Sequence, residues 1–456
     1  MDDKTKKIST FLIVTSLIGV AIFSYNFFIP NNNDKLLYDS KRIFLLTLIS
    51  LNALFIITMP NLRKKITEIR LSHQSNIACV LFLFSVLVAN FFTDYPSRAW
   101  MDFLYSIGLL LLILVLSISA RSKRLIIYSL FFVIGLLLFL STLIGYWSDL
   151  LNFSSRPDYF SIIGIVNPRV VNQMQAWVFI PIFYFTLISF RNSKYKRTLL
   201  LLATQISLLI STDARGASLS ILGGVILLFI VSNNRKDIVK VSAHAIILGI
   251  AIKLLLFSPV PGYLILGENL ELFSFRTTTQ DRIDIWLQTI NNLTFIGGGG
   301  NSYPCLTGGT TPHNSVLLIA INWGILAAVA YVYLVIKLFI SIFNKCNTLK
   351  ERVIAISIMT ALAYSLISGV LVYPLSQVLG ILSFSLLLSY RATNKNNANT
   401  LFLRKIITNS LCIIIIITCT LFSYERINND FYIEEGPMVL TPQFWLELRG
   451  DHCIDR

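Results

Sequence analysis

Long apolar stretches separated by short polar segments make up most of the chain. A helix needs roughly 20 consecutive apolar residues to cross the hydrocarbon core of a bilayer, and the stretches have about that length. We interpret them as about 12–13 transmembrane helices, the first of which lacks a small-residue cleavage site and is expected to be retained. The predicted spans lie near residues 10–29, 42–59, 76–92, 101–119, 125–146, 173–190, 198–212, 217–232, 240–257, 314–342, 353–371, 374–390 and 406–422. The pattern therefore predicts an all-α integral membrane protein.

The composition agrees with this interpretation. Of the 456 residues, 55% are hydrophobic and only 13% are charged, and the mean hydropathy is +0.71. Soluble globular proteins contain about 25% charged residues. The composition therefore excludes that class.

The lysine and arginine residues indicate the orientation of the spans. They gather in every second gap between predicted spans, and positive loops tend to stay in the cytoplasm. These gaps contain Lys4, Lys6 and Lys7; Arg63, Lys64, Lys65 and Arg70; Arg121, Lys123 and Arg124; Arg191, Lys194, Lys196 and Arg197; Arg235, Lys236 and Lys240; Lys345, Lys350 and Arg352; and Arg391, Lys395, Arg404 and Lys405. We therefore predict a cytoplasmic N-terminus and a membrane domain at 1–422. Its large loop at 258–313 and the tail at 423–456 are expected on the opposite side.

A smaller set of arginines on that opposite side is of interest. The net charge of +15 mostly reflects the basic gaps, so the expected polar partners are membrane lipids and not nucleic acid. Among the arginines outside these gaps are Arg169, Arg215, Arg276 and Arg282, each beside a span end or in a polar loop. Guanidinium groups suit phosphate oxygens, so several of them together would bind a polyanion. The alternative is that each pairs with a lipid phosphate or with a nearby acid such as Asp213, Asp281 or Asp284.

The six cysteines do not form a metal-binding pattern. Neither a CxxC pair nor a cysteine–histidine cluster with zinc spacing is present, so we expect no metal and no cofactor. Cys305 and Cys453 both fall on the predicted external side, where an oxidising compartment would allow a disulfide. The alternative is two unpaired thiols.

The large loop contains most of the polar chemistry. Residues 283–290 place apolar side chains on one helical face, with Arg282 at the start of that helix. A glycine run follows at 297–300, and His313 stands immediately before a long apolar span. A histidine at this position can exchange a proton near neutral pH. It can equally be a residue that begins a helix or donates an interfacial hydrogen bond.

In combination, these motifs resemble the O-antigen ligase and polymerase superfamily. They are the Arg-Ile-Asp-Ile-Trp segment at 282–286, the glycine run, and Pro312-His313-Asn314 with Gly324 eleven positions after the histidine. The Thr-Asp-Ala-Arg-Gly segment at 212–216 is similar to the earlier arginine–glycine signature of that family. The resemblance covers roughly residues 160–345.

The resemblance implies a GT-C-like fold in a bacterial inner membrane, with the active face in the periplasm. It implies metal-independent, inverting transfer of a glycan from undecaprenyl diphosphate to an acceptor hydroxyl. His313 would orient or deprotonate that hydroxyl, and Arg215 and Arg282 would stabilise the leaving diphosphate. Further contacts to diphosphate or glycan are expected from Arg276, Arg169, Asn314 and Asn172, although a simple loop and helix cap is as good an interpretation of the segment at 167–173.

The acceptor is left open. A ligase transfers the glycan to lipid A-core, a polymerase to another lipid-linked unit, and an oligosaccharyltransferase to a serine or threonine of a protein such as pilin. We favour the ligase because H-x10-G after the large loop is more similar to ligases. The aromatic and polar tail at 436–446 would suit a protein acceptor. The competing class is an anion transporter, which would need several charges inside its spans, whereas the predicted spans contain chiefly Lys253 and Lys337.

Overall fold

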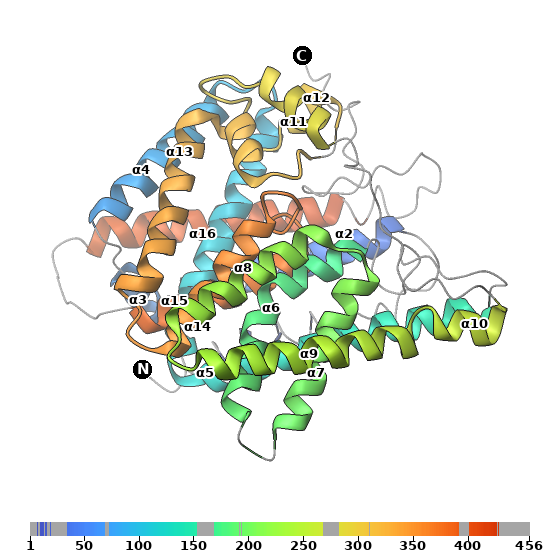
Figure 1. Ribbon diagram of the computed structural model, residues 1–456. Coiled ribbons are helices and arrows are strands. Elements are labelled where there is room, and N and C mark those ends of the chain that lie inside the picture. Colours follow the sequence, from blue (N-terminus) through green and yellow to red (C-terminus); the bar gives the residue numbers. More distant parts are fainter. Residues whose placement is uncertain are drawn as a thin grey trace.

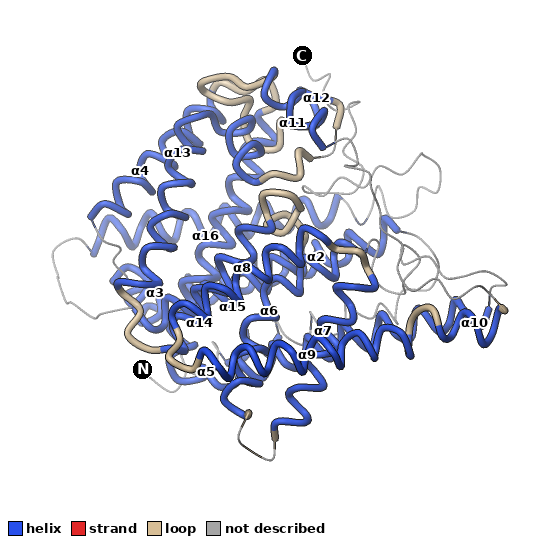
Figure 2. Tube along the Cα trace, viewed as in Figure 1, coloured by secondary structure: helices blue, strands red, loops and turns tan. Residues whose placement is uncertain are grey.

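The computed structural model is helical almost throughout the part of the chain that it describes. It describes residues 34–68, 73–152, 168–190, 192, 194–267, 282–309, 311–391, 401–425 and 427, together with isolated positions between 7 and 19. Within these ranges only helices and loops occur, as Figure 2 shows. The predicted all-α class is therefore confirmed for the described residues.

The helices follow one another with short connections. They are α2 (Asp34–Thr58), α3 (Pro60–Glu68), α4 (His73–Phe91), α5 (Pro96–Asn152), α6 (Pro168–Ser189), α7 (Tyr195–Ser211), α8 (Arg215–Val231), α9 (Arg235–Leu256), α10 (Val260–Leu266), α11 (Arg282–Asn291), α12 (Tyr303–Thr307), α13 (Ser315–Asn344), α14 (Leu349–Tyr364), α15 (Pro374–Arg391) and α16 (Leu401–Glu425). Figure 1 shows α11 and α12 together at one end of the molecule, beside the end of α13.

Eight helices of the described part are long and apolar enough to cross a membrane, so the chain has the character of a multi-pass membrane protein. The predicted spans at 198–212, 217–232, 353–371 and 374–390 correspond to α7, α8, α14 and α15, which do not reach that length or hydropathy. Most of the predicted span at 10–29 lies outside the described residues.

The less apolar helices α14 and α15 form the interior of the bundle. Most of their residues are buried, and they pack against α5, α6, α8 and each other. Their serine, threonine and glycine residues face neighbouring helices, where small side chains permit close packing. Trp177 of α6, for example, donates from Nε1 to Ser376 Oγ at 2.9 Å. An interior helix needs no lipid-facing apolar surface, which explains why its composition differs from that of the outer spans.

Two of the predicted spans belong to one bent helix. The basic segment at 121–124, expected to be a gap between spans, lies within α5, whose 57 residues contain a non-helical Lys123. A straight helix of this length would extend about 85 Å, far beyond the hydrocarbon core. The segments Pro96–Ile118 and Lys123–Asn152 are therefore two candidate spans that meet at a kink.

Several of the basic segments contact each other. They are predicted to lie on one face of the membrane domain. Arg391 Nε lies 3.0 Å from Glu351 Oε1, and Arg124 Nη2 donates to the carbonyl oxygen of Ser389 at 2.8 Å. The hydroxyl of Tyr128 donates to the Lys350 carbonyl at 3.0 Å. These contacts join the kink of α5 to the start of α14 and the end of α15, so three of the predicted basic gaps lie together.

We expect the Arg391–Glu351 pair to stabilise the bundle. Glu351→Ala should lower the free energy of unfolding by about 2 kcal/mol, because the guanidinium of Arg391 loses a charged hydrogen bond but remains 30% exposed to solvent. Thermal unfolding of the purified protein in detergent measures the change. Lys350→Ala, an exposed neighbour on the same helix, is the control. Equal stability of both variants would contradict the assignment.

Candidate functional site

The glycine run and Gly324 meet in one backbone contact. Gly324 has a φ of 86° and interrupts the helical geometry of α13. The loop backbone uses the opened turn: Gly298 donates to the Ile321 carbonyl at 2.9 Å, and Gly299 to the Asn322 carbonyl at 2.7 Å. Ile325 in turn donates to the Phe295 carbonyl at 3.2 Å. The large loop is therefore fastened to the break in α13 by main-chain hydrogen bonds.

This contact requires glycine on both sides. A Cβ atom added to Gly297, whose φ is 90°, would lie 2.4 Å from the Gly324 nitrogen. A Cβ added to Gly324 would lie 2.4 Å from the Phe295 carbonyl oxygen. Backbone atoms cannot yield as a flexible side chain can, and a φ in this range strains any other residue. The two glycine motifs of the sequence are thus two halves of one structural feature.

His313 stands on a short segment that is held at both ends. On its N-terminal side, Trp286 of α11 donates from Nε1 to the Pro312 carbonyl at 2.9 Å. On its C-terminal side, the side-chain oxygen of Asn314 accepts from the amides of Val316 and Leu317 and caps α13. The histidine itself has a φ of 52°. The predicted helix at 283–290 and the predicted place of His313 before a helix are both confirmed.

The charge around His313 comes from two of the predicted arginines. Burial, followed by the positive charges of Arg169 and Arg282, lowers the pKa of this imidazole to about 4. A cation next to these guanidinium groups is disfavoured because like charges repel. The imidazole is therefore neutral at neutral pH and can accept a proton.

Arg282 and Arg215 make no ion pair with any acid that the structure describes. The alternative of pairing with Asp213 or Asp284 is therefore wrong for these two arginines, and Asp281 lies outside the described residues. The Nε of Arg282 is buried without a hydrogen-bond partner. Two guanidinium groups on this side of the protein are thus available to an anion.

Hydrogen bonds and close packing bring the helix ends of the site together. Gly216, next to Arg215, packs on Tyr364, and Tyr364 interacts electrostatically with both Arg282 and Arg169. Gln173 of α6 donates to Ser368 Oγ at 3.0 Å. The starts of α6, α8 and α11 therefore converge around the connection between α14 and α15.

Of the remaining predicted site residues, two have side-chain oxygens in hydrogen bonds within the protein and one lies outside the described residues. Thr212 donates to Asn172 Oδ1 at 3.0 Å, and the Oδ1 of Asn314 is occupied by the cap of α13. Both side-chain oxygens thus have a structural role, and contacts of these residues to a ligand stay predictions. Arg276 lies outside the described residues.

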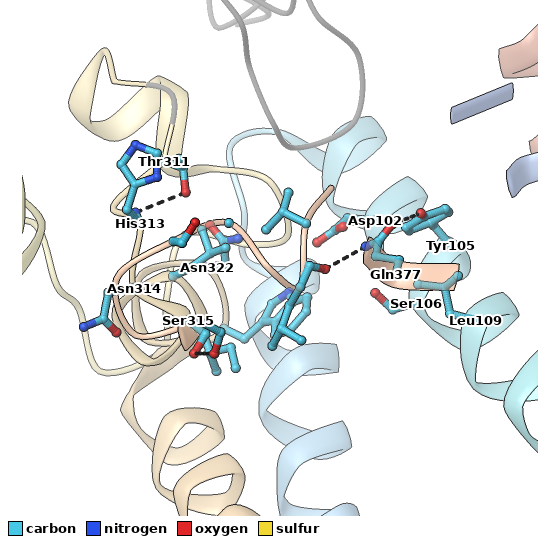
Figure 3. Close-up of a pocket in the computed structure, with 18 residues that line it drawn as sticks. Asp102, Tyr105, Ser106, Leu109, Thr311, His313, Asn314, Ser315, Asn322 and Gln377 are labelled. Atoms are coloured by element: carbon cyan, nitrogen blue, oxygen red, sulfur yellow. Dashed lines mark hydrogen bonds between the residues drawn. The ribbon is translucent and has the colours of Figure 1, made fainter. Parts of the chain in front are cut away.

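A cavity of about 220 Å³ with a mainly apolar wall opens beside His313. Figure 3 shows His313 and Asn314 on one side of it and Asp102, Tyr105 and Gln377 on the other. The walls come from α5, α13 and the 365–372 turn, a segment that the sequence analysis had placed inside a span. Most of these lining residues were missed from the sequence. A signal existed for Asp102, which is the only acid in the predicted span at 101–119.

A buried arginine supports the far wall of this cavity. Arg42 is fully buried and donates to the Tyr105 hydroxyl at 2.7 Å and to Gln377 Oε1 at 3.0 Å. It also donates to the Val372 carbonyl at 3.0 Å. The network joins α2, α5 and α15, so the positions of Tyr105 and Gln377 depend on three separate helices.

Cys305 takes part in a disulfide, while the other described cysteines are free. Arg98 Nη1 also lies 3.1 Å from its sulfur. The proposed partner Cys453 lies outside the described residues, so the pairing of these two cysteines stays a prediction.

Neither the protein-family models nor the curated proteins compared with this chain match it. The resemblance to O-antigen ligases and polymerases therefore rests on the residues themselves. Within the described part of the chain, no three histidine, cysteine or acidic side chains are grouped so that they could hold a metal ion. The described positive charge at the site belongs to arginines, next to a neutral histidine and a cavity that Asp102 lines.

The contact at Gly324 can be tested by adding one methyl group. Gly324→Ala should release the loop from α13, because the new Cβ meets backbone and the residue is strained by about 1–3 kcal/mol. Faster cleavage by trypsin after Arg282 in the purified protein would report this release. Gly223→Ala, which meets no atom within 4 Å, should leave the cleavage rate unchanged. Equal protection of both variants would show that the contact does not hold the loop.

Proposed function

We propose that this protein is a glycosyltransferase of the O-antigen ligase type in the bacterial inner membrane. It transfers a glycan from undecaprenyl diphosphate to a hydroxyl of lipid A-core at the periplasmic face. The observation that carries the proposal is the neutral His313 beside Arg282 and Arg169, at the rim of a cavity. This arrangement combines a proton acceptor with a site for a polyanion.

The arginines bind the leaving group. The acceptor oxygen forms a bond to the anomeric carbon, and the bond from that carbon to the diphosphate oxygen breaks. The electron pair stays with the diphosphate, whose growing charge is stabilised by Arg282 and by Arg215. Support for this role comes from the absence of any described acid paired with either side chain. A single displacement of this kind inverts the anomeric configuration.

His313 accepts the proton of the acceptor hydroxyl. In the empty site its low pKa makes it a weak base, because burial disfavours the charged imidazolium and the neighbouring arginines repel it. A bound diphosphate brings negative charge that offsets those arginines and raises the pKa of the imidazole. The histidine therefore becomes more basic only when the donor is present, which couples proton removal to the occupied site.

The proposal is tested by replacing the two central residues. Arg282→Ala and His313→Ala should each lower transfer about 100-fold or more, since each removes a group that acts in the transition state. The assay compares lipopolysaccharide, pilin and lipid-linked glycan from a strain lacking the native gene, at equal membrane levels of each variant. Arg197→Ala, an exposed arginine in a predicted cytoplasmic loop, is the control and should retain full activity.

The glycan distribution separates the alternatives. Loss of polymer from lipid A-core, with lipid-linked polymer accumulating, supports the ligase. Loss from pilin alone would replace it with a protein oligosaccharyltransferase, and shortened chains would indicate a polymerase. Unchanged glycans in both variants would contradict the assignment as an enzyme and would favour the anion transporter.

The charged surroundings of His313 predict that the acid limbs of the pH profiles of kcat/KM and kcat lie at different pH. The base must be neutral, so kcat/KM for the donor, which reports the free enzyme, should fall only as the pH drops toward about 4. The acid limb of kcat reports the donor complex and should lie at higher pH. Arg169→Gln removes one positive charge and should shift the limb of kcat/KM upward. Coinciding limbs, or no shift in the variant, would contradict the assignment of His313 as the base.

A further inference from the structure

Asp102 is an acid at the cavity that the mechanism above does not use. It lies near the start of α5, across the cavity from His313, as Figure 3 shows. Among the described residues it makes no hydrogen bond and no ion pair. A carboxylate removed from water is costly unless something satisfies its oxygens. The open oxygens of Asp102 therefore face a space that a ligand can occupy.

A hydrogen-bond donor is left open at the same cavity. Trp323 of α13 lines the cavity, and its indole Nε1 is buried without a partner in the described part of the chain. Burying an N–H group without an acceptor also costs free energy. One uncommitted acceptor and one uncommitted donor thus belong to residues that line the same cavity. Together they match a ligand group that both donates and accepts, as a hydroxyl does.

The carboxylate of Asp102 is positioned by its surroundings. The backbone of Gly300 approaches so closely that an added Cβ would lie 3.0 Å from Asp102 Oδ2. Arg42 attracts the carboxylate through space from its own network with Tyr105 and Gln377. The glycine run that fastens the loop to α13 therefore also borders this acid.

The rest of the lining suits a sugar ring. The cavity wall is mainly apolar, and a few hydroxyl-bearing side chains also line it. The hydroxyls of Thr311, Ser315, Ser365 and Ser368 already hydrogen-bond within the protein, whereas that of Ser106 makes no hydrogen bond in the described part of the chain. The apolar side chains include Leu109, Leu318 and Leu371. An apolar wall for ring carbons, with Asp102 and Ser106 open to hydroxyls, suits a sugar ring, and no lysine or arginine lines the cavity to bind a phosphate.

We infer that this cavity is the acceptor subsite, where a sugar of the acceptor donates a hydroxyl hydrogen bond to Asp102 and accepts one from Trp323. The inference rests on the proposed function. Arg169 and Arg282 act on His313 but do not line the cavity. The histidine therefore lies between two regions, with the diphosphate on the arginine side and the acceptor sugar on the Asp102 side.

Steady-state kinetics of the full-length protein in nanodiscs test this assignment. The donor is undecaprenyl-diphosphate-linked glycan, and the acceptor is rough lipopolysaccharide, which ends in lipid A-core. Asp102→Asn should raise KM for the acceptor by about tenfold or more, as expected for the loss of a hydrogen bond to a charged group. KM for the donor should stay within about twofold. Trp323→Phe should raise the acceptor KM in the same selective way.

Controls separate binding from folding. Asp284→Asn, an exposed acid on α11, should change neither KM, and the unfolding temperatures of all variants should match. An unchanged acceptor KM in Asp102→Asn, or an equal rise for donor and acceptor, would overturn the acceptor subsite while leaving the proposed function intact. A wild-type protein that transfers nothing to rough lipopolysaccharide would overturn the ligase and the subsite together.

Discussion

A break in one transmembrane helix holds the site in place. In lipid, backbone groups released by a broken helix must be satisfied by protein. At Gly324 the carbonyls of Ile321 and Asn322 are satisfied by amides of the glycine run, and the loop becomes part of the membrane domain. The position of α11 follows from this contact, and through Trp286 and Pro312 so does that of His313. The same glycine run borders Asp102, so both sides of the cavity depend on one backbone contact.

The site brings positive charge close to His313 from Arg169 and Arg282. Arg282 and Arg215 pair with none of the described acids, and the neighbouring histidine is kept neutral. Such an arrangement is electrostatically unfavourable when empty, and binding a polyanion relieves it. On the cavity side of His313 the nearby charge is negative, because the carboxylate of Asp102 lines the cavity wall. The histidine therefore lies at a boundary between a region that attracts anions and one that suits neutral hydroxyl groups.

The prediction of spans succeeded where helices meet lipid and was less accurate in the interior. Outer helices such as α4 and α13 must present apolar surface, so their length and composition reveal them. Interior helices such as α14 and α15 are surrounded by protein, and their serine and glycine residues weaken the hydropathy signal. The predicted span at 353–371 consequently ran past Tyr364 into a turn that lines the cavity. The kink at Lys123 has the sequence pattern of a gap between two spans, because basic residues interrupt the apolar pattern there.

The sequence by itself determined the helical membrane class, the grouping of basic helix ends, the helix after Arg282 and the place of His313 before α13. These features follow from composition and local periodicity, which act over a few turns of helix. Only the tertiary structure decided that the glycine run packs on Gly324, that Arg169 and Arg282 share the environment of His313, and that Asp102 faces the same cavity. Each of these contacts joins residues far apart in the chain. Their proximity depends on how the helices pack, and no local pattern specifies that packing.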